Sequence, residues 1–302
     1  MPSMTDRIAQ GPEGDRLLGF TLPDRDARGR VVRLGPVLHK ILAAHDYAPA
    51  IKRLLAEALV VTALLGGLLK RAGSQVTLQA QTEKGVVELL VCDYRDGELR
   101  GYVKHSAERL ARLGANPTLA GLFGKGHLAI TFDAAEAQER YQGVVPLEGT
   151  TLAEAVEAYF ARSEQVPTLL RTAVRTGTGD CVAGGLLVQH MADAEEGRDR
   201  IDQRADRPEW EHVAILAQTV RPEELLDPEL SAEALVWRLF HEEREVRVQA
   251  AAQLSRGCRC SVGHFEEVLA RFPKEDRRDM RDEDGIIRVD CAFCSREFPI
   301  QD

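Results

Sequence analysis

Four cysteines near the C-terminus constrain this chain more than any other feature of its sequence. They form two pairs, Cys258-x-Cys260 and Cys291-x-x-Cys294, which are separated by thirty residues. Four thiolates suit tetrahedral zinc, because soft sulfur ligands match a borderline-soft ion that has no geometric preference of its own. The single residue between Cys258 and Cys260 still allows both sulfurs to reach one ion if the local backbone bends. We therefore predict one zinc ion per chain, held by all four cysteines in a small unit over residues 257–302.

Loss of the metal is expected to have a large effect on this unit. Zinc binding is worth roughly 10–16 kcal/mol in small zinc-binding peptides. A unit of this length has little core of its own and would be marginally stable without the ion. Thiolates are also the species that oxidants attack, and oxidation would remove the ligands. The unit should then unfold, so the pattern suits a redox switch.

Other interpretations of the cysteines remain open at this point. The two pairs could be unrelated reduced thiols, or Cys291-x-x-Cys294 could be a catalytic thioredoxin-like motif. No βαβ pattern surrounds that motif, however, and we expect no helix after it to lower a thiol pKa. A zinc ribbon that serves only as an interaction module, for example for nucleic acid, is the strongest rival. The segment from Cys258 to Asp302 has eight Lys/Arg and eleven Asp/Glu, a local net charge of −3 that argues against a phosphate-binding surface.

The remaining cysteines and nearby histidines do not extend the predicted site. Cys92 lies in a predicted strand and Cys181 in an apolar stretch, so we expect both to be small buried hydrophobes. His241 and His264 lie near the cysteine pairs in sequence, but four thiolates already fill the zinc shell. Six cysteines in 302 residues also do not resemble a secreted disulfide scaffold, and in a reducing cytosol such a cluster is expected to bind metal or to be catalytic rather than to form structural cross-links.

Charge and hydropathy bound the classes of partner. The formal net charge of −9 repels nucleic acid and anionic membranes. The longest apolar run, Ala58–Leu69, is about half as long as a membrane-spanning helix requires, and residues 1–10 lack the apolar region of a secretory signal. We see no nucleophile motif, paired carboxylates or phosphate-binding loop. We therefore expect a soluble, cytoplasmic protein that is not an enzyme and has no nucleic-acid or membrane partner.

Residues 1–190 read as a mixed α+β core domain. Apolar residues at helical spacing predict a helix over 47–71, and a second, amphipathic helix over 151–163. The dipeptide Asp96–Gly97 favours a tight hairpin turn. Strands and helices alternate without a regular βαβ rhythm, which indicates the α+β class. The predicted strands cover residues 75–81, 85–94, 98–103 and 126–133.

Residues 191–256 read as a charged insert followed by a helical linker. The stretch 191–209 has almost no large apolar residue and is expected to be a flexible insertion. Residues 211–241 are helical in character, and Pro222 and Pro228 divide them into short pieces. The last piece carries an apolar stripe that could bind client proteins, although packing on the core is its expected role while zinc is bound. The stripe consists of Leu235, Val236, Leu239 and Phe240.

At its cysteines the chain resembles the redox-regulated 33-kDa heat-shock chaperonin family, since both pairs and the gap between them match that family's pattern. The resemblance covers nearly the whole chain, except for the charged insert around residues 193–206. Other segments similar to family signatures are Tyr141–Val145, Ser163–Gln165, Gly184–Gly185, Glu223–Leu226 and Trp237–Glu243.

This resemblance implies an ATP-independent chaperone that holds unfolding client proteins. The reduced form would bind zinc and be inactive. Oxidation, assisted by heat, would pair Cys258 with Cys260 and Cys291 with Cys294 and release the metal. The middle helices would then loosen and expose apolar surface, and the oxidised chain would form a homodimer.

Overall fold

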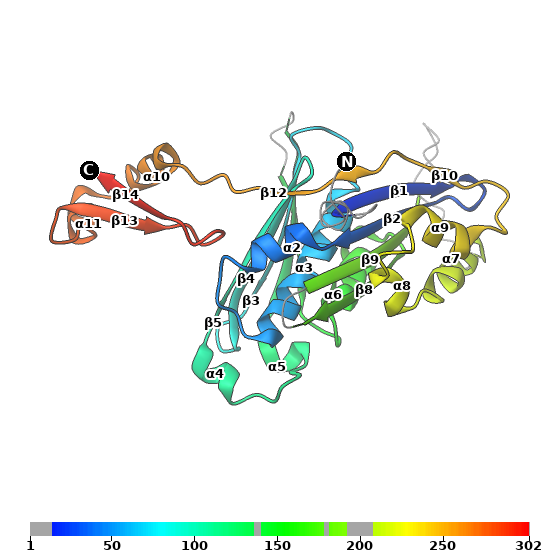
Figure 1. Cartoon of the computed structure of the whole chain (residues 1–302), viewed down its shortest axis with the longest axis horizontal. Coiled ribbons are helices and arrows are strands. Elements are labelled where there is room, and N and C mark those ends of the chain that lie inside the picture. Colours follow the sequence, from blue (N-terminus) through cyan, green and yellow to red (C-terminus); the bar gives the residue numbers. More distant parts are fainter. Residues whose placement is uncertain (1–13, 136–139, 178–180, 192–207, 302) are drawn as a thin grey trace, which may run out of the picture.

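The chain folds around two six-stranded sheets that enclose a central helix (Figure 1). The computed structural model describes residues 14–135, 140–177, 181–191 and 208–301. Sheet A has the order β10-β1-β2-β9-β8, with β11 also paired to β1. Its strands are β1 (Arg16–Leu22), β2 (Ala27–Leu34), β8 (Thr168–Thr176), β9 (Cys181–His190), β10 (Arg247–Val248) and β11 (Ala252–Gln253).

Sheet B has the order β12-β5-β4-β3-β6-β7, and only its β12–β5 pair is parallel. The four strands predicted from the sequence correspond to β3 to β6, and the fold class is α+β as expected. Asp96 and Gly97 both have positive φ, 50° and 84°, which confirms the tight turn between β4 and β5. The strands are β3 (Gln75–Gln81), β4 (Val87–Arg95), β5 (Glu98–His105), β6 (His127–Asp133), β7 (Arg140–Pro146) and β12 (Ser255–Arg256).

Helix α3 (Pro49–Gly66) lies between the sheets and contacts strands of both. It begins two residues later than predicted, because Pro49 occupies the first turn, where its missing N–H costs nothing. It ends at Gly66, five residues earlier than predicted, because the Gly66–Gly67 pair disfavours a helix. The second predicted helix is α6 (Leu152–Tyr159), which continues as a π-helical turn, η2 (Phe160–Glu164). The remaining helices of this part are η1 (Pro23–Arg25), α2 (Pro36–Leu42), α4 (Ala107–Ala111) and α5 (Leu119–Phe123). None of the described helices combines the length and hydropathy needed to cross a bilayer.

Three helices cover the outer face of sheet A: α7 (Pro208–Gln218), α8 (Pro222–Leu226) and α9 (Ala232–Phe240). The expected packing of the apolar stripe on the core is confirmed. Its four residues are at most 4% exposed, and the Phe240 ring lies 5.5 Å from that of Phe20 on β1. Sheet A is therefore buried on both faces, which explains the nearly continuous apolar sequence of β9. Most of the predicted flexible insertion, residues 192–207, lies outside the described residues.

Two adjacent glycines in β9 allow helices to approach both faces of sheet A. Neighbouring residues of a strand face opposite sides. A Cβ added at Gly184 would lie 2.2 Å from the Leu225 carbonyl oxygen of α8, whereas one at Gly185 would lie 2.6 Å from Cγ1 of Val60 in α3. The Gly184–Gly185 pair is thus required by close packing of a helix on each side.

We expect Gly184→Ala to destabilise the chain by about 1–3 kcal/mol, because the clash is with backbone and cannot be relieved by rotating a side chain. Urea unfolding of the reduced, metal-loaded chain would measure the loss. Gly263→Ala is the control. Gly263 lies in a helix with no atom within 4 Å of the added Cβ, so this change should be neutral or slightly stabilising. Equal stability of the two variants would contradict the packing role.

Before it enters the C-terminal unit, the chain adds short edge strands to both sheets. The short strands β10 and β11 pair with β1, and β12 pairs with β5. Residues 257–301 then project from the sandwich (Figure 1). The sequence pattern predicts a turn at Asp284–Gly285 followed by a short strand, Ile286–Val289, and both are present, with Gly285 at φ 78°. Two helices in this unit were not predicted. The unit contains α10 (Val262–Leu269), α11 (Lys274–Asp279), β13 (Ile286–Asp290) and β14 (Glu297–Gln301).

Candidate metal centre

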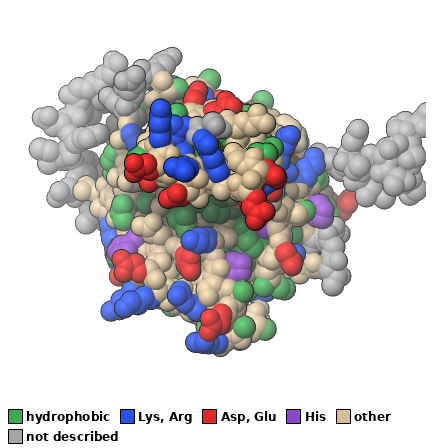
Figure 2. All heavy atoms as spheres, turned by 90° about the vertical axis from the view of Figure 1, so that its left-hand side faces the viewer, with side chains coloured by type: hydrophobic (Ala, Val, Ile, Leu, Met, Phe, Trp, Pro, Cys, Tyr) green, Lys and Arg blue, Asp and Glu red, His purple; other side chains and the backbone are tan. Residues whose placement is uncertain are grey.

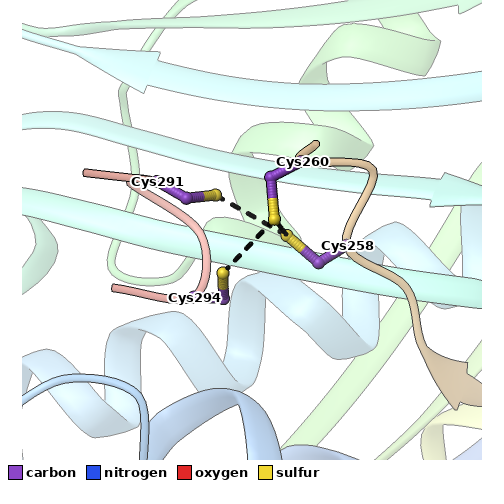
Figure 3. Close-up of side chains that lie close together, drawn as sticks. All are labelled: Cys258, Cys260, Cys291 and Cys294. Atoms are coloured by element: carbon purple, nitrogen blue, oxygen red, sulfur yellow. Dashed lines mark hydrogen bonds between the residues drawn. The ribbon is translucent and has the colours of Figure 1, made fainter. Parts of the chain in front are cut away.

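The four cysteine sulfurs of the C-terminal unit converge on one point (Figure 3). All four Sγ atoms lie within 4.8 Å of one another. Cys258 lies 3.2 Å from Cys260 and 3.6 Å from Cys291, and Cys260 lies 3.6 Å from Cys294, measured between sulfurs. A tetrahedral zinc–sulfur site with bonds of about 2.3 Å has sulfurs about 3.8 Å apart. The donor set therefore fits a single zinc-sized ion.

Tight turns place the sulfurs. Cys291 directly follows β13, and its carbonyl accepts hydrogen bonds from the N–H groups of Cys294 (3.2 Å) and Ser295 (2.8 Å). Ser295 has φ of 54°, which turns the chain back into β14. The N–H groups of Phe293 and Cys294 also donate to the Cys291 sulfur, and that of Cys260 donates to the Cys258 sulfur. Such N–H donors stabilise thiolates, the form that binds metal.

The electrostatics of the cluster favour a bound cation. Burial, followed by the neighbouring cysteine sulfurs, raises the pKa of Cys260 far above its ordinary value. Burial also raises the pKa of Cys291. For Cys258, burial opposes ionisation, but hydrogen bonds from the Cys260 N–H and the other cysteines outweigh it and lower the pKa. Four adjacent thiolates repel one another, so full ionisation requires a positive charge among them, which a divalent metal supplies.

The other cysteines and histidines lie apart from this cluster. Cys92 is fully buried in β4, and burial raises the pKa of its thiol, as expected of a structural cysteine. Cys181 was expected to be buried but is only half-buried, because it begins the strand β9, and desolvation raises its pKa to about 11. His241 and His264 are exposed and do not join the four sulfurs. Across the described ranges, no other group of His, Cys, Asp or Glu has ligand atoms so placed.

Residues within and beside the cysteine motifs attach the metal centre to the core domain, a role that the sequence did not predict. Phe293 contacts β5 of sheet B, and its ring lies 5.0 Å from that of Tyr102. Arg259, between Cys258 and Cys260, donates a hydrogen bond to the Gln75 side chain of β3. The Ser295 hydroxyl lies 3.0 Å from Nδ1 of His45. In the sequence, only the positions of these residues inside or next to the cysteine motifs could have indicated that they contact the core domain.

Comparisons with known proteins agree with this arrangement. The family model described as "Hsp33 protein" matches residues 15–301. A 33 kDa chaperonin of Caulobacter vibrioides (strain NA1000 / CB15N) is 38% identical over 294 residues, covering 95% of this chain and 94% of the relative. One from Escherichia coli (strain K12 / DH10B) is 36% identical over 289 residues, covering 95% and 92%.

The fold is also found in a solved structure. The crystal structure of the 33 kDa chaperonin (heat shock protein 33 homolog) of Thermotoga maritima matches with a TM-score of 0.76 and 23% identity over 95% of each chain. At that identity the match supports the fold, while the family model and the closer relatives, each spanning nearly the whole chain, show the family. The chain therefore belongs to the Hsp33 family of chaperonins.

Proposed function

We propose that this chain is a redox-regulated, ATP-independent chaperone that is inactive while its four cysteines hold zinc. The observation that carries the proposal is the convergence of four sulfurs within 4.8 Å in a unit with only five buried core side chains among its described residues. Such a unit depends on its metal, since zinc binding supplies roughly 10–16 kcal/mol in comparable peptides. The chaperonin names of the relatives support a chaperone role.

The switching step is the conversion of four zinc-bound thiolates into two disulfides. For each disulfide, two thiolates lose two electrons to one hydrogen peroxide molecule, which takes up two protons and becomes two waters. The zinc ion leaves because disulfide sulfurs no longer carry the charge that bound it. We propose Cys258–Cys260 and Cys291–Cys294 as the pairs. Cys258 and Cys260 are 3.2 Å apart, but the cross-motif distances of 3.6 Å make peptide mass mapping necessary.

Loss of the unit would propagate along the chain into the linker. We propose a core domain over residues 1–190, a linker over 191–256 and the switch unit over 257–302. The linker's final part is held by strands β10, β11 and β12 of only two residues each, by backbone hydrogen bonds from Gln249, Leu254 and Ser255, and by the buried Leu254 side chain. Once these strands detach, α9 loses its anchoring on one side. Its stripe of Leu235, Val236, Leu239 and Phe240 would then leave sheet A and bind clients.

The partners that we propose are unfolding proteins and, in the oxidised form, a second copy of the chain. An apolar surface exposed by release of α9 suits unfolding polypeptides, which expose apolar side chains themselves. On the end of the molecule that carries the C-terminal unit, Lys/Arg and Asp/Glu side chains are interspersed (Figure 2). This mixed surface and the net charge of −9 favour proteins over nucleic acid. No turnover of a substrate is required.

Peroxide treatment with mild heating tests the proposal. We expect release of about one zinc ion per chain together with the onset of aggregation suppression toward a thermally unfolding protein. Reductant and added zinc should reverse both. The control is the untreated chain at the same temperature, which should keep its zinc and remain inactive. Zinc release without any suppression of aggregation would contradict the chaperone proposal and leave a structural zinc module.

A further inference from the structure

Phe293 fills a cradle on the outer face of sheet B that two residues of β5 form. The guanidinium carbon of Arg100 lies 4.1 Å from the centroid of the Phe293 ring. The Tyr102 ring meets the same ring edge-on, with centroids 5.0 Å apart and an interplanar angle of 84°. A cation over the face and a second ring at an edge are the contacts that an aromatic quadrupole favours. The cradle is thus specific for an aromatic side chain rather than for apolar volume alone.

The core domain builds this cradle without help from the C-terminal unit. Asp93 of β4 is only 3% exposed and accepts a hydrogen bond from Nε of Arg100 (2.7 Å), while Nη2 of Arg100 lies 2.6 Å from the same carboxylate oxygen as an ion pair. The Thr77 hydroxyl of β3 donates a further bond of 2.7 Å to Asp93. A charged hydrogen bond reinforced by a close ion pair is stronger than a neutral hydrogen bond and holds the guanidinium group in place. The position of Arg100 is therefore set by three neighbouring strands of sheet B.

The occupant, by contrast, depends on the cysteine cluster. Phe293 lies between Cys291 and Cys294, and the turn that presents it is held by the sulfur positions. Beside it, the Arg259–Gln75 and Ser295–His45 contacts, together with a hydrogen bond between His45 and the Phe293 backbone, also tie the cysteine motifs to core side chains. Unfolding of the C-terminal unit would withdraw Phe293 and leave the cradle intact and open.

We propose that the Arg100–Tyr102 cradle is a binding site for aromatic side chains of unfolding client proteins, which Phe293 occupies while the C-terminal unit is folded. We infer that the client side chain is aromatic because the chain's own Phe293 fills the cradle in the folded form. Unfolding proteins present such residues, because phenylalanine is normally buried in their cores. This inference rests on the proposed function, and it adds a second client contact on the face of the molecule opposite α9.

A pair of peptides tests the site in the full-length chain. One is a short, flexible, fluorescently labelled peptide with a single central phenylalanine, and the other carries cyclohexylalanine, which keeps the shape but has no π-system. After peroxide treatment with mild heating, we expect the chain to bind the phenylalanine peptide about threefold to tenfold more tightly than the cyclohexylalanine peptide. The reduced, zinc-loaded chain should show no such preference, because Phe293 occupies the cradle.

Two substitutions connect this preference to the cradle. Arg100→Gln should abolish it in the oxidised chain, while affinity for the cyclohexylalanine peptide and zinc release stay unchanged. Phe293→Ala should produce the preference in the reduced chain without peroxide, and this variant keeps every side chain of the cradle. Equal binding of the two peptides to the oxidised chain, or a preference that survives Arg100→Gln, would overturn the inference. If the oxidised chain still suppresses aggregation when the aromatic preference is absent, only this inference fails and the proposed function stands. If the oxidised chain does not suppress aggregation, the proposed function itself is refuted.

Discussion

Replacement of Cys291 by serine is expected to yield a chain that contains no zinc and suppresses client aggregation without oxidant. Cys291 is 6% exposed, and it is both a sulfur of the cluster and a member of the unit's small core. A serine hydroxyl stays protonated at neutral pH and does not replace a thiolate ligand. The four core side chains that remain cannot replace the roughly 10–16 kcal/mol that zinc supplies. Metal analysis of the purified chain, paired with light scattering of a heated client protein, measures both effects.

The matched control is Cys181→Ser. Cys181 is a partly exposed thiol in β9, outside the cluster, so its loss should leave the zinc content and the inactive state unchanged. A Cys291→Ser chain that retains about one zinc ion per molecule would show that the four-sulfur assignment is wrong. A zinc-free Cys291→Ser chain that does not suppress aggregation would show that loss of the metal alone does not activate the chaperone.

Phe240→Ala should release helix α9 while zinc remains bound. The Phe240 side chain is fully buried against Phe20 of β1, and removing such a ring costs about 3–5 kcal/mol when the cavity cannot collapse. This cost falls on the contact between α9 and sheet A. We expect faster amide hydrogen exchange in α7–α9 and partial suppression of aggregation in the reduced form.

Trp237→Ala provides the control on the same helix. Trp237 is 65% exposed and faces away from sheet A, so its removal should change stability by no more than about 0.5 kcal/mol. Similar activation by both substitutions would mean that the identity of the buried face does not matter. The role of the apolar stripe as a covered client surface would then fail.

The sequence was sufficient for elements with a strong local pattern. Alternation in Gln75–Gln81 and the Asp96–Gly97 turn placed β3 to β5, and apolar spacing placed α3, apart from the ends that Pro49 and the sheet contacts determine. The cysteine cluster was predictable because four thiols with this spacing have few other uses. The family resemblance pointed to the same residues, and the family model confirms the family.

The remainder depends on contacts that no local pattern contains. The two-residue strand Arg247–Val248 exists only because β1 offers a free edge, and two residues carry no periodicity. Helix Lys274–Asp279 has no apolar residue, so no amphipathic signal marks it. The Ser261 hydroxyl that caps α10, accepting from the His264 N–H, was a usable signal that went unused. The docking of Phe293 on Arg100 joins residues far apart in the chain and required the fold.

Hydrogen exchange, measured on one sample before and after oxidative zinc release, tests whether the metal centre controls the linker helices. We predict that amides of α7, α8 and α9 lose protection in step with zinc release, while those of α3, buried between the two sheets, keep theirs. Complete zinc release with α7–α9 still protected would contradict this prediction, because the cysteine cluster would then be a local structural site with no connection to the covered apolar surface.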